Sequence, residues 1–370
     1  MPRLLLAALA AAILSCTLPA AAAAERSVPR GWLGAIADGP VTEPGAAVDA
    51  EWDLMASSGV EFVRTAFHWP TVQREEGVPP DLTPFDTVVL AAARRNLPIV
   101  PIVTGTPGWA GGQQGDETSP PRSPALYGRF LATLVERYGP RGTLWDAHPE
   151  VPRRPIRDWQ VWNEPNLTRY WSRQPFARSY VKLLRAAHGA LRSADPGARV
   201  ILAGLPNESW TALRSIYRAN GRRYFDAVAL HPYTGRPRNV VRLAEFARRE
   251  MRRFGDRRKP IWITELSWPA AKGRTKNTAG FETTDAGQAV RLREGIRLLA
   301  RARKRLRIEH VFWYTWLSRE GSPNSFAYSG LRRVRDGRVI TVPALGAYRR
   351  IARRLQGCAK APGDAARCRP

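Results

Sequence analysis

Hydrophobic residues recur along the chain in two alternating patterns. Short runs of β-branched and aromatic residues are typical of buried strands, and the longer segments between them repeat apolar residues at helical spacing. The predicted strands are 31–38, 62–69, 98–105, 156–164, 199–206, 226–233, 260–268 and 309–316. Several of the intervening segments end in Gly or Asn, as helices often do. The pattern therefore predicts an alternation of strand and helix throughout 31–357.

The number of these repeats indicates the fold class. Alternation of strand and helix favours a parallel sheet with helical crossovers, and eight units favour closure of that sheet into a barrel. An open doubly wound sheet is the alternative, but it needs a glycine-rich phosphate-binding turn after the first strand. The sequence GAIADGPV at 34–41 has no such fingerprint. We therefore expect an α/β protein whose catalytic domain, 25–357, is a single (β/α)8 TIM barrel.

The two ends of the chain have their own patterns. Residues 1–24 combine an early arginine, a short apolar run and an alanine-rich stretch, which predicts a secretory signal peptide. A lipid anchor on Cys16 is the alternative, because the residues before it loosely resemble a bacterial lipobox. Outside the signal, Cys358 and Cys368 are expected to form a disulfide that closes the tail 358–370 in an oxidising compartment. We expect an exported protein.

The formal net charge of +26 comes mainly from arginine. Such a charge is typical of proteins that bind nucleic acids or anionic surfaces. Here the basic residues fall mostly on predicted helices, where they would form a solvated outer face, and export argues against nucleic-acid binding. Binding of an acidic polymer stays open as an alternative. We expect no membrane span and a monomer.

The candidate chemistry lies at the C-terminal ends of the predicted strands, where barrel enzymes assemble their active sites. Glu164 ends the fourth strand within Asn-Glu-Pro, and Glu265 ends the seventh. Glycosidic bond cleavage needs two facing carboxyl groups, one a protonated acid and one an ionised carboxylate at the anomeric carbon. Asn-Glu-Pro alone also fits a helix N-terminus. Its pairing with Glu265 favours the catalytic interpretation.

Other residues at strand ends fit this chemistry. Arg64 is expected to keep a neighbouring carboxylate ionised. Trp109 and Trp316 are expected to stack on the apolar face of a sugar ring, and His231 and Tyr233 end the sixth strand. Arg64 and His231 each have a structural alternative, as a buried ion pair and a core histidine. The sequence has no metal-ligand cluster, phosphate-binding loop or Ser-His-Asp order, so we expect neither a metal nor a cofactor.

The motifs around these residues resemble a known family. WQVWNEPN at 159–166 and PIWITELSW at 260–268 look like the two glutamate signatures of the clan A glycoside hydrolases. The resemblance covers 31–357, and GTPGWA at 105–110 is more similar to family 39 than to family 5. It implies a retaining glycoside hydrolase that cleaves a poly- or oligosaccharide by double displacement.

The resemblance also implies a role for each matching residue. Glu164 would be the acid/base and Glu265 the nucleophile. Arg64 would lie beside the nucleophile, Asn163 would bind the substrate 2-hydroxyl, Tyr233 would orient Glu265, and Trp316 would form the floor of the sugar site. A transglycosylase would use the same residues. A catalytically silent carbohydrate-binding barrel is the alternative from another class, and retention of both glutamates counts against it.

Overall fold

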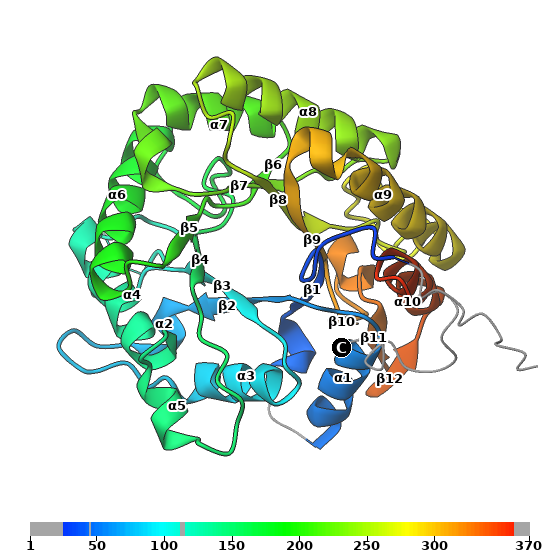
Figure 1. Ribbon diagram of the computed structural model, residues 1–370, viewed down its shortest axis with the longest axis horizontal. Coiled ribbons are helices and arrows are strands. Elements are labelled where there is room, and N and C mark those ends of the chain that lie inside the picture. The colour runs from blue at the N-terminus through cyan, green and yellow to red at the C-terminus, as the bar shows by residue number, and fades with distance from the viewer. Residues whose placement is uncertain (1–24, 44–45, 112–114, 359–370) are drawn as a thin grey trace, which may run out of the picture.

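The computed structural model describes residues 25–43, 46–111 and 115–358. Parallel strands form a central sheet in the order β5-β4-β3-β2-β1-β9-β8-β7-β6, and helices surround it (Figure 1). The strands are β1 (Leu33–Ala37), β2 (Val63–His68), β3 (Ile99–Thr104), β4 (Asp158–Val161), β5 (Arg199–Ile201), β6 (Leu205–Pro206), β7 (Val228–His231), β8 (Ile261–Leu266) and β9 (Ile308–Trp313). The prediction of a parallel sheet with helical crossovers is confirmed, and the fold is α/β and barrel-like.

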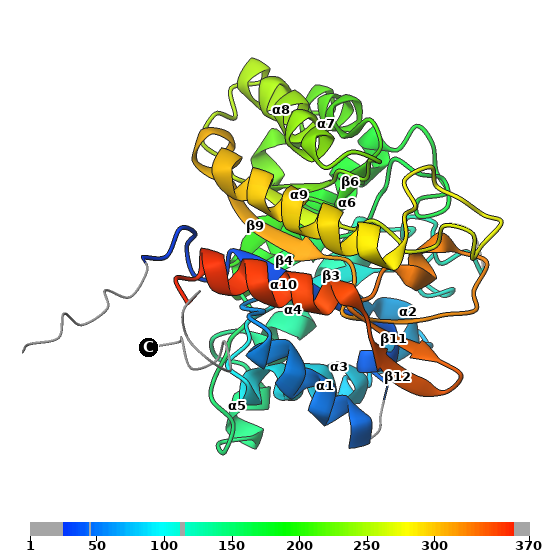
Figure 2. The same cartoon turned by 90° about the vertical axis from the view of Figure 1, so that its right-hand side faces the viewer.

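A helix follows almost every strand and packs on the outside of the sheet, as Figure 1 shows. The helices are α1 (Ala46–Ser57), α2 (Trp69–Val72), α3 (Thr83–Arg94), α4 (Pro124–Tyr138), α5 (Thr143–Ala147), α6 (Ala177–Ala194), α7 (Ser209–Arg218), α8 (Arg238–Arg253), α9 (Asp285–Leu306) and α10 (Pro343–Leu355). In Figure 2, α9 and α10 lie side by side across one flank of the sheet. Within the described ranges, none of these helices is long and apolar enough to cross a membrane.

The predicted strand 199–206 is interrupted in the structure. It forms the short strands β5 and β6, and the backbone between them bonds partly to a side chain: the Ala203 N–H donates to the Tyr180 hydroxyl at 2.9 Å. An isolated bridge still joins Ile201, the last residue of β5, to Ala227, just before β7. Because β6 also pairs with β7, both short strands contact the same neighbour.

Side chains alternate between the two faces of the sheet. On β9, Val311 and Trp313 belong to the large hydrophobic cluster that the sheet shares with the helices, whereas Phe312 belongs to a separate small cluster. This inner cluster comprises Ile36, Phe62, Val100, Ile201, Ala227, Ala229, Trp262 and Phe312. Packed side chains therefore fill the interior of the barrel and support the C-terminal ends of its strands.

Two features at the end of the chain complete the fold. A separate three-stranded sheet of β10 (Leu317–Arg319), β11 (Arg332–Arg335) and β12 (Arg338–Thr341) lies between β9 and α10, and it was not predicted. After α10, Cys358 is buried and disulfide-bonded. Its expected partner, Cys368, lies outside the described residues, so the pairing of these two cysteines stays a prediction.

Candidate active site

Glu164 lies on a backbone turn that follows the end of β4. Trp162 has a φ of 69° and Glu164 a φ of 43°, in the left-handed region that residues other than glycine seldom adopt. The Trp162 N–H donates to the Val103 carbonyl at 3.0 Å, and the Glu164 N–H donates to the Gly204 carbonyl at 3.1 Å. A strained turn persists only where its surroundings impose it. These anchors hold Glu164 at the mouth of the barrel.

Glu265 reaches the same mouth through an irregularity in β8. Ile263 and Leu266 both pack in the large outer cluster although they are three positions apart, which breaks the alternation of a regular strand. The pairing of β8 with β9 shifts register between these two residues. A bulge of this kind re-aims the side chain that it contains. The irregularity therefore turns Glu265 away from the helices and into the mouth.

The partners of Glu265 favour its ionised form. Arg64 Nη1 donates to Glu265 Oε1 at 2.9 Å, and the Tyr233 hydroxyl donates to Oε2 at 2.6 Å. Burial raises the pKa of Glu265, but the charges of His231 and Arg64 and the bond from Tyr233 outweigh it and hold this pKa below its usual value. Burial and the charge of Glu265 raise the pKa of Tyr233, which therefore stays a hydrogen-bond donor.

Arg64 contacts both Glu265 and Asn163, the residue before Glu164. Its side chain is fully buried. Besides Glu265, its guanidinium donates to Gln160 Oε1 at 2.7 Å and to Asn163 Oδ1 at 3.2 Å. A planar guanidinium whose three nitrogens each donate a hydrogen bond has little rotational freedom. Arg64 therefore fixes the position of Glu265 relative to the Asn163–Glu164 turn.

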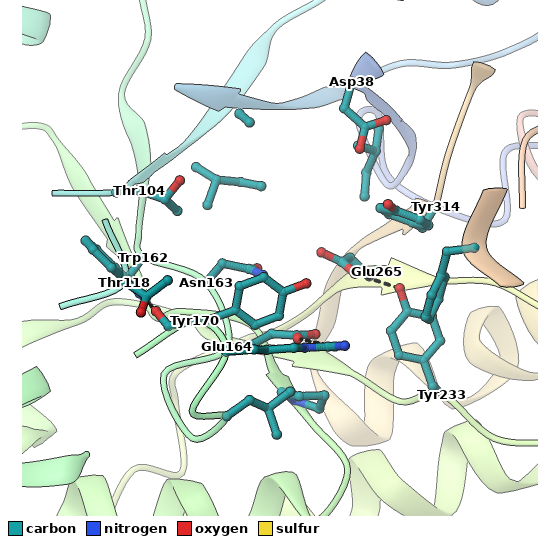
Figure 3. A pocket seen from close by; sticks show the side chains of 18 of the residues that line it. Asp38, Thr104, Thr118, Trp162, Asn163, Glu164, Tyr170, Tyr233, Glu265 and Tyr314 are labelled. Carbon is teal, nitrogen blue, oxygen red and sulfur yellow. Dashed lines mark hydrogen bonds and ion pairs between the residues drawn. The ribbon is translucent and has the colours of Figure 1, made fainter. Parts of the chain in front are cut away.

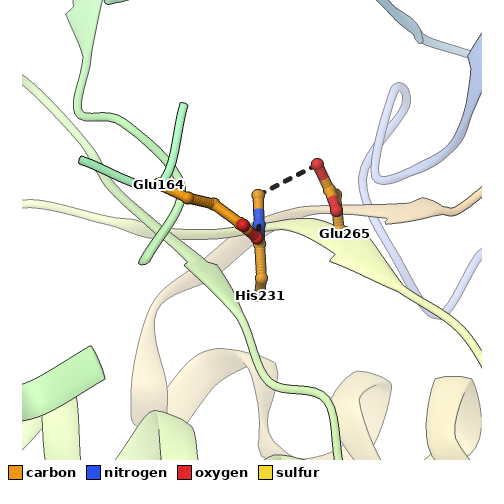
Figure 4. A group of neighbouring side chains, drawn as sticks. All are labelled: Glu164, His231 and Glu265. Carbon is orange, nitrogen blue, oxygen red and sulfur yellow. Dashed lines mark hydrogen bonds and ion pairs between the residues drawn. The ribbon is translucent and has the colours of Figure 1, made fainter. Parts of the chain in front are cut away.

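His231, the last residue of β7, lies between the two glutamates (Figure 4). Its Nδ1 is hydrogen-bonded to Glu164 Oε1 at 2.7 Å, and its Nε2 lies 3.4 Å from Glu265 Oε1, at ion-pair distance but without hydrogen-bond alignment. Only glycine fits at position 204, because a Cβ there would lie 1.9 Å from His231 Nε2. Oxygens of Glu164 and Glu265 lie within 4.8 Å of each other.

The same three side chains are the one group in the described ranges whose ligand-type atoms are close enough to hold a metal ion. Most of their atoms are already hydrogen-bonded, although His231 Nε2 is not. His231 Nδ1 bonds to Glu164, and both oxygens of Glu265 accept hydrogen bonds from Arg64 and Tyr233. A guanidinium against a ligand carboxylate repels a cation. The arrangement fits a hydrogen-bonded acid–base pair better than a metal centre.

Both glutamates line a cavity of about 770 Å³ at the C-terminal ends of the strands (Figure 3). Its other polar lining residues include Asp38, Arg64, His68, Thr104, Glu117, Thr118, Asn163, Arg169, Asn207 and Asn324. Arg169 Nη2 lies 3.4 Å from Glu164 Oε2, and its guanidinium stacks over the Tyr170 ring at 4.7 Å. The structure therefore brings Glu164, Glu265, Arg64, Asn163 and Tyr233 together around one cavity, with His231 behind the glutamates.

Two predicted sugar platforms lie elsewhere. Trp316 is fully buried in the core, where its indole N–H donates to Glu51 Oε2 at 3.0 Å. Trp109 packs edge-on against Trp69, with ring centroids 5.6 Å apart, and donates to the Gln73 carbonyl at 3.1 Å. Neither indole lines the cavity. The structure thus contradicts the prediction that Trp316 floors the sugar site, and it gives Trp109 a packing role.

Other aromatic side chains line the cavity instead. They are Trp162, Tyr170, Tyr233, Phe281, Tyr314 and Phe326. Tyr233 stacks on Phe281 with ring centroids 5.3 Å apart, and Tyr314 meets Phe326 edge-on at 5.5 Å. Tyr314 could have been found from the sequence, since it directly follows β9 at an alternate position from the inward-facing Phe312. Phe281 lies in a loop and Phe326 in a one-turn 3-10 helix, Ser325–Tyr328, so no periodic sequence signal marked them.

Comparisons with known proteins support the fold. No protein-family model and no curated protein matches the chain. Among solved structures, a family 39 glycoside hydrolase from Bacteroides cellulosilyticus is similar, with a TM-score of 0.66, 18% identity and coverage of 87% of this chain and 63% of that one. A monomeric β-xylosidase from Caulobacter crescentus has a TM-score of 0.66 and 19% identity, with 88% and 69% covered.

A third similar structure is an exo-β-1,4-mannosidase from an Opitutaceae bacterium, with a TM-score of 0.61, 16% identity and coverage of 92% of this chain and 62% of that one. At these identities, the matches concern the fold, and function must be argued from the site. The resemblance predicted from the sequence is confirmed at that level: the chain has the fold of the clan A glycoside hydrolases, with family 39 enzymes among its structural neighbours.

Proposed function

We propose that the chain is a retaining glycoside hydrolase that cleaves O-glycosidic bonds of a poly- or oligosaccharide by double displacement. One observation carries the proposal. Two buried carboxyl groups with oxygens within 4.8 Å of each other line one cavity and have different partners. Retaining enzymes hold their two carboxyl groups about 5–5.5 Å apart, whereas inverting enzymes separate them by about 6.5–9.5 Å. The short separation supports the retaining mechanism.

In the first step, Glu265 attacks the anomeric carbon of the bound sugar. The carbon–oxygen bond to the leaving group breaks, and Glu164 donates a proton to the departing oxygen. This step leaves a glycosyl ester on Glu265 and a carboxylate on Glu164. The bonds from Arg64 and Tyr233 support Glu265 as the nucleophile, because they stabilise its ionised form.

In the second step, Glu164 takes a proton from a water molecule, which attacks the anomeric carbon and releases Glu265. The hydrogen bond between His231 Nδ1 and Glu164 Oε1 leaves Oε2 with Arg169, a largely exposed side chain at 3.4 Å, as its one side-chain partner among the described residues. Oε2 is therefore the oxygen that can exchange protons with the leaving group and with water. His231 acts here as a positioning residue.

Three further proposals concern the whole chain. We count β5 and β6 as one interrupted strand, which gives the eight strands of a (β/α)8 barrel; the bridge from Ile201 to Ala227 supports this count. We propose that residues 1–24 direct export, with lipidation at Cys16 as the alternative, and that the mature protein is a monomer. The mass of the exported protein tests the cleavage site and the lipid together.

The function is tested with chromogenic aryl β-xylosides, β-glucosides and β-mannosides and with a panel of polysaccharides. We expect the wild-type protein to release the chromophore or reducing sugar from at least one of them, and Glu265→Gln to release none. Equal rates for the two proteins on every substrate would contradict the proposal.

A further inference from the structure

A third carboxyl group lines the cavity, and the mechanism above does not use it. Asp38 directly follows the last residue of β1, and its side chain points into the same cavity as Glu265 and Tyr314 (Figure 3). The residue is partly buried. β1 pairs with β9, whose end carries Tyr314, so the two side chains come from neighbouring strands.

Asp38 has few hydrogen-bond partners. Among the described residues, Thr315 is the only other residue whose side chain is hydrogen-bonded to its carboxyl group, through Oδ1. The Thr315 hydroxyl also lies 2.9 Å from the Ile36 carbonyl oxygen. A hydroxyl carries one proton, so it cannot donate to both oxygens at once. Both contacts become hydrogen bonds when Asp38 itself is protonated at Oδ1.

The electrostatic surroundings of Asp38 differ from those of a structural ion pair. No Lys or Arg in the described ranges lies within ion-pair distance of its carboxyl group, whereas Glu265 is paired with Arg64. Burial raises the pKa of Asp38 to about 6, and the negative charge of Glu265 adds to this effect. The charge of Arg64 and the bond from Thr315 oppose this effect only in part. A partly buried carboxyl group without an ion-pair partner is costly unless a ligand uses it. Asp38 lines the cavity, where a ligand can reach it.

We propose that Asp38 is a specificity residue that binds a hydroxyl group of the sugar whose glycosidic bond is cleaved. The proposal rests on the proposed function, since it assigns a binding role within the same site. A carboxyl oxygen beside an aromatic ring suits a sugar, because it can accept a bond from an equatorial hydroxyl while the ring covers the apolar face. Asp38 would thereby select sugars that carry a hydroxyl at the contacted position.

The test combines a variant with modified substrates. The parent probe is whichever 2,4-dinitrophenyl β-glycoside of xylose, glucose or mannose the wild-type protein hydrolyses fastest. Its analogues each lack one hydroxyl other than the 2-hydroxyl. For one analogue, we expect wild-type kcat/KM to fall roughly 10–100-fold. On the parent glycoside, the kcat/KM of Asp38→Ala should be lower than that of the wild type by a similar factor. Removal of that same hydroxyl from the substrate should then lower the kcat/KM of Asp38→Ala by less than about threefold.

Two controls separate binding from folding. Glu117→Gln removes another carboxylate that lines the cavity, one that is half-exposed and lies 3.5 Å from His68, and its deoxy effects should match those of the wild type. Asp38→Asn keeps the shape of the side chain. The melting temperatures of Asp38→Ala and Asp38→Asn are compared with that of the wild type, to check that a loss of activity does not come from misfolding. If every deoxy substitution costs Asp38→Ala as much as it costs the wild type, the proposal is wrong.

The design also distinguishes this proposal from the proposed function. If the wild type hydrolyses a glycoside, and the effects of Asp38→Ala and of each missing hydroxyl on kcat/KM are additive, only the role of Asp38 is overturned. If the wild type hydrolyses none of the glycosides, calorimetric titration of the same compounds into wild type and Asp38→Ala decides the role of Asp38 in binding. Absence of binding to the wild type would overturn both proposals.

Discussion

The barrel holds charged side chains at both of its ends, and the cavity that contains the two glutamates lies at only one of them. At the start of the strands, Arg199 on β5 lies 2.7 Å from Glu309 on β9 and 3.5 Å from Asp158 on β4. The Trp262 indole donates to Glu309 at 2.6 Å. None of these residues lines the cavity at the opposite end. This basal cluster, one arginine between two carboxyl groups, is a set of structural ion pairs.

The cluster at the strand ends is arranged differently. Arg64 pairs with Glu265, but Glu164 has a histidine on one oxygen and only the loosely placed Arg169 on the other. The two glutamates face each other beside an open cavity. The comparison teaches that a buried ion pair in a barrel is not by itself a sign of catalysis. Two unequal carboxyl groups that share a cavity are the distinguishing feature.

The largest effect is expected from Glu265→Ala. It removes the nucleophile, so kcat should fall roughly 10⁴-fold or more on every substrate. Because the change also leaves Arg64 without its carboxylate, melting temperature must be measured beside kcat. Glu265→Gln keeps the volume and one of the two hydrogen-bond acceptors, and it should be equally inactive. Substantial turnover by a folded Glu265→Gln would break the assignment of the nucleophile.

Glu164→Ala should be less severe and should depend on the substrate. Loss of a general acid typically costs about 10²–10⁴-fold. Leaving groups such as 2,4-dinitrophenolate need no proton, so the first step should survive on them and the glycosyl ester should accumulate. Azide needs no general base and should restore turnover as a glycosyl azide. Rescue that is absent here, or equal in Glu265→Ala, would count against the acid/base role.

The basal cluster provides the contrasting variant, Glu309→Gln. The side chains of Arg199 and Glu309 are 35% and 36% exposed, so solvent screens their attraction. We expect a loss of about 1 kcal/mol in the free energy of unfolding, measured by denaturant titration. Steady-state kcat/KM should stay within about twofold of the wild type. If Glu309→Gln lowered kcat/KM as much as the Glu164 or Glu265 variants do, the distinction between the two ends would be wrong.

The smallest effect is a change in pH dependence in Tyr233→Phe. The Tyr233 hydroxyl stabilises ionised Glu265, so its removal should raise the pKa of that carboxyl group. Since Glu265 must be ionised to attack, the acid limb of the kcat/KM profile should move to higher pH, with most activity retained on the plateau. Tyr314→Phe lacks a hydroxyl that makes no described bond to Glu265 and serves as the control. An unmoved acid limb in Tyr233→Phe would show that the hydroxyl has no part in ionising Glu265.

Much of this arrangement could be predicted from the sequence, because strands and their ends are marked by hydrophobic runs. The ends of the predicted strands 156–164 and 260–268 carry Glu164 and Glu265, and the rule for barrel active sites brings them to one face. The bulge in β8 could not be predicted, because it depends on the register between neighbouring strands. The sequence identified the glutamate but not the backbone irregularity that aims it.

The cavity walls were harder to predict than the two glutamates. The family resemblance implied that Trp316 forms the floor of the sugar site, yet Trp316 lies beyond the end of β9 and is buried in the core. Tyr314, two positions after the inward-facing Phe312, lines the cavity instead. Asp38 lies in Asp-Gly-Pro, which reads as an ordinary turn. Phe281 comes from a loop and Phe326 from a one-turn 3-10 helix, and their rings contact each other across the two segments. Such residues carry no periodic signal.

The measurement that tests the central claim most directly is the stereochemistry of the first product. Proton NMR during hydrolysis of an aryl β-glycoside resolves the α and β anomers of the released sugar before they equilibrate by mutarotation. Two glutamates with oxygens within 4.8 Å of each other predict double displacement, so the β anomer should appear first. An initial α anomer would mean that water attacks directly, and it would contradict the role of Glu265 as the nucleophile.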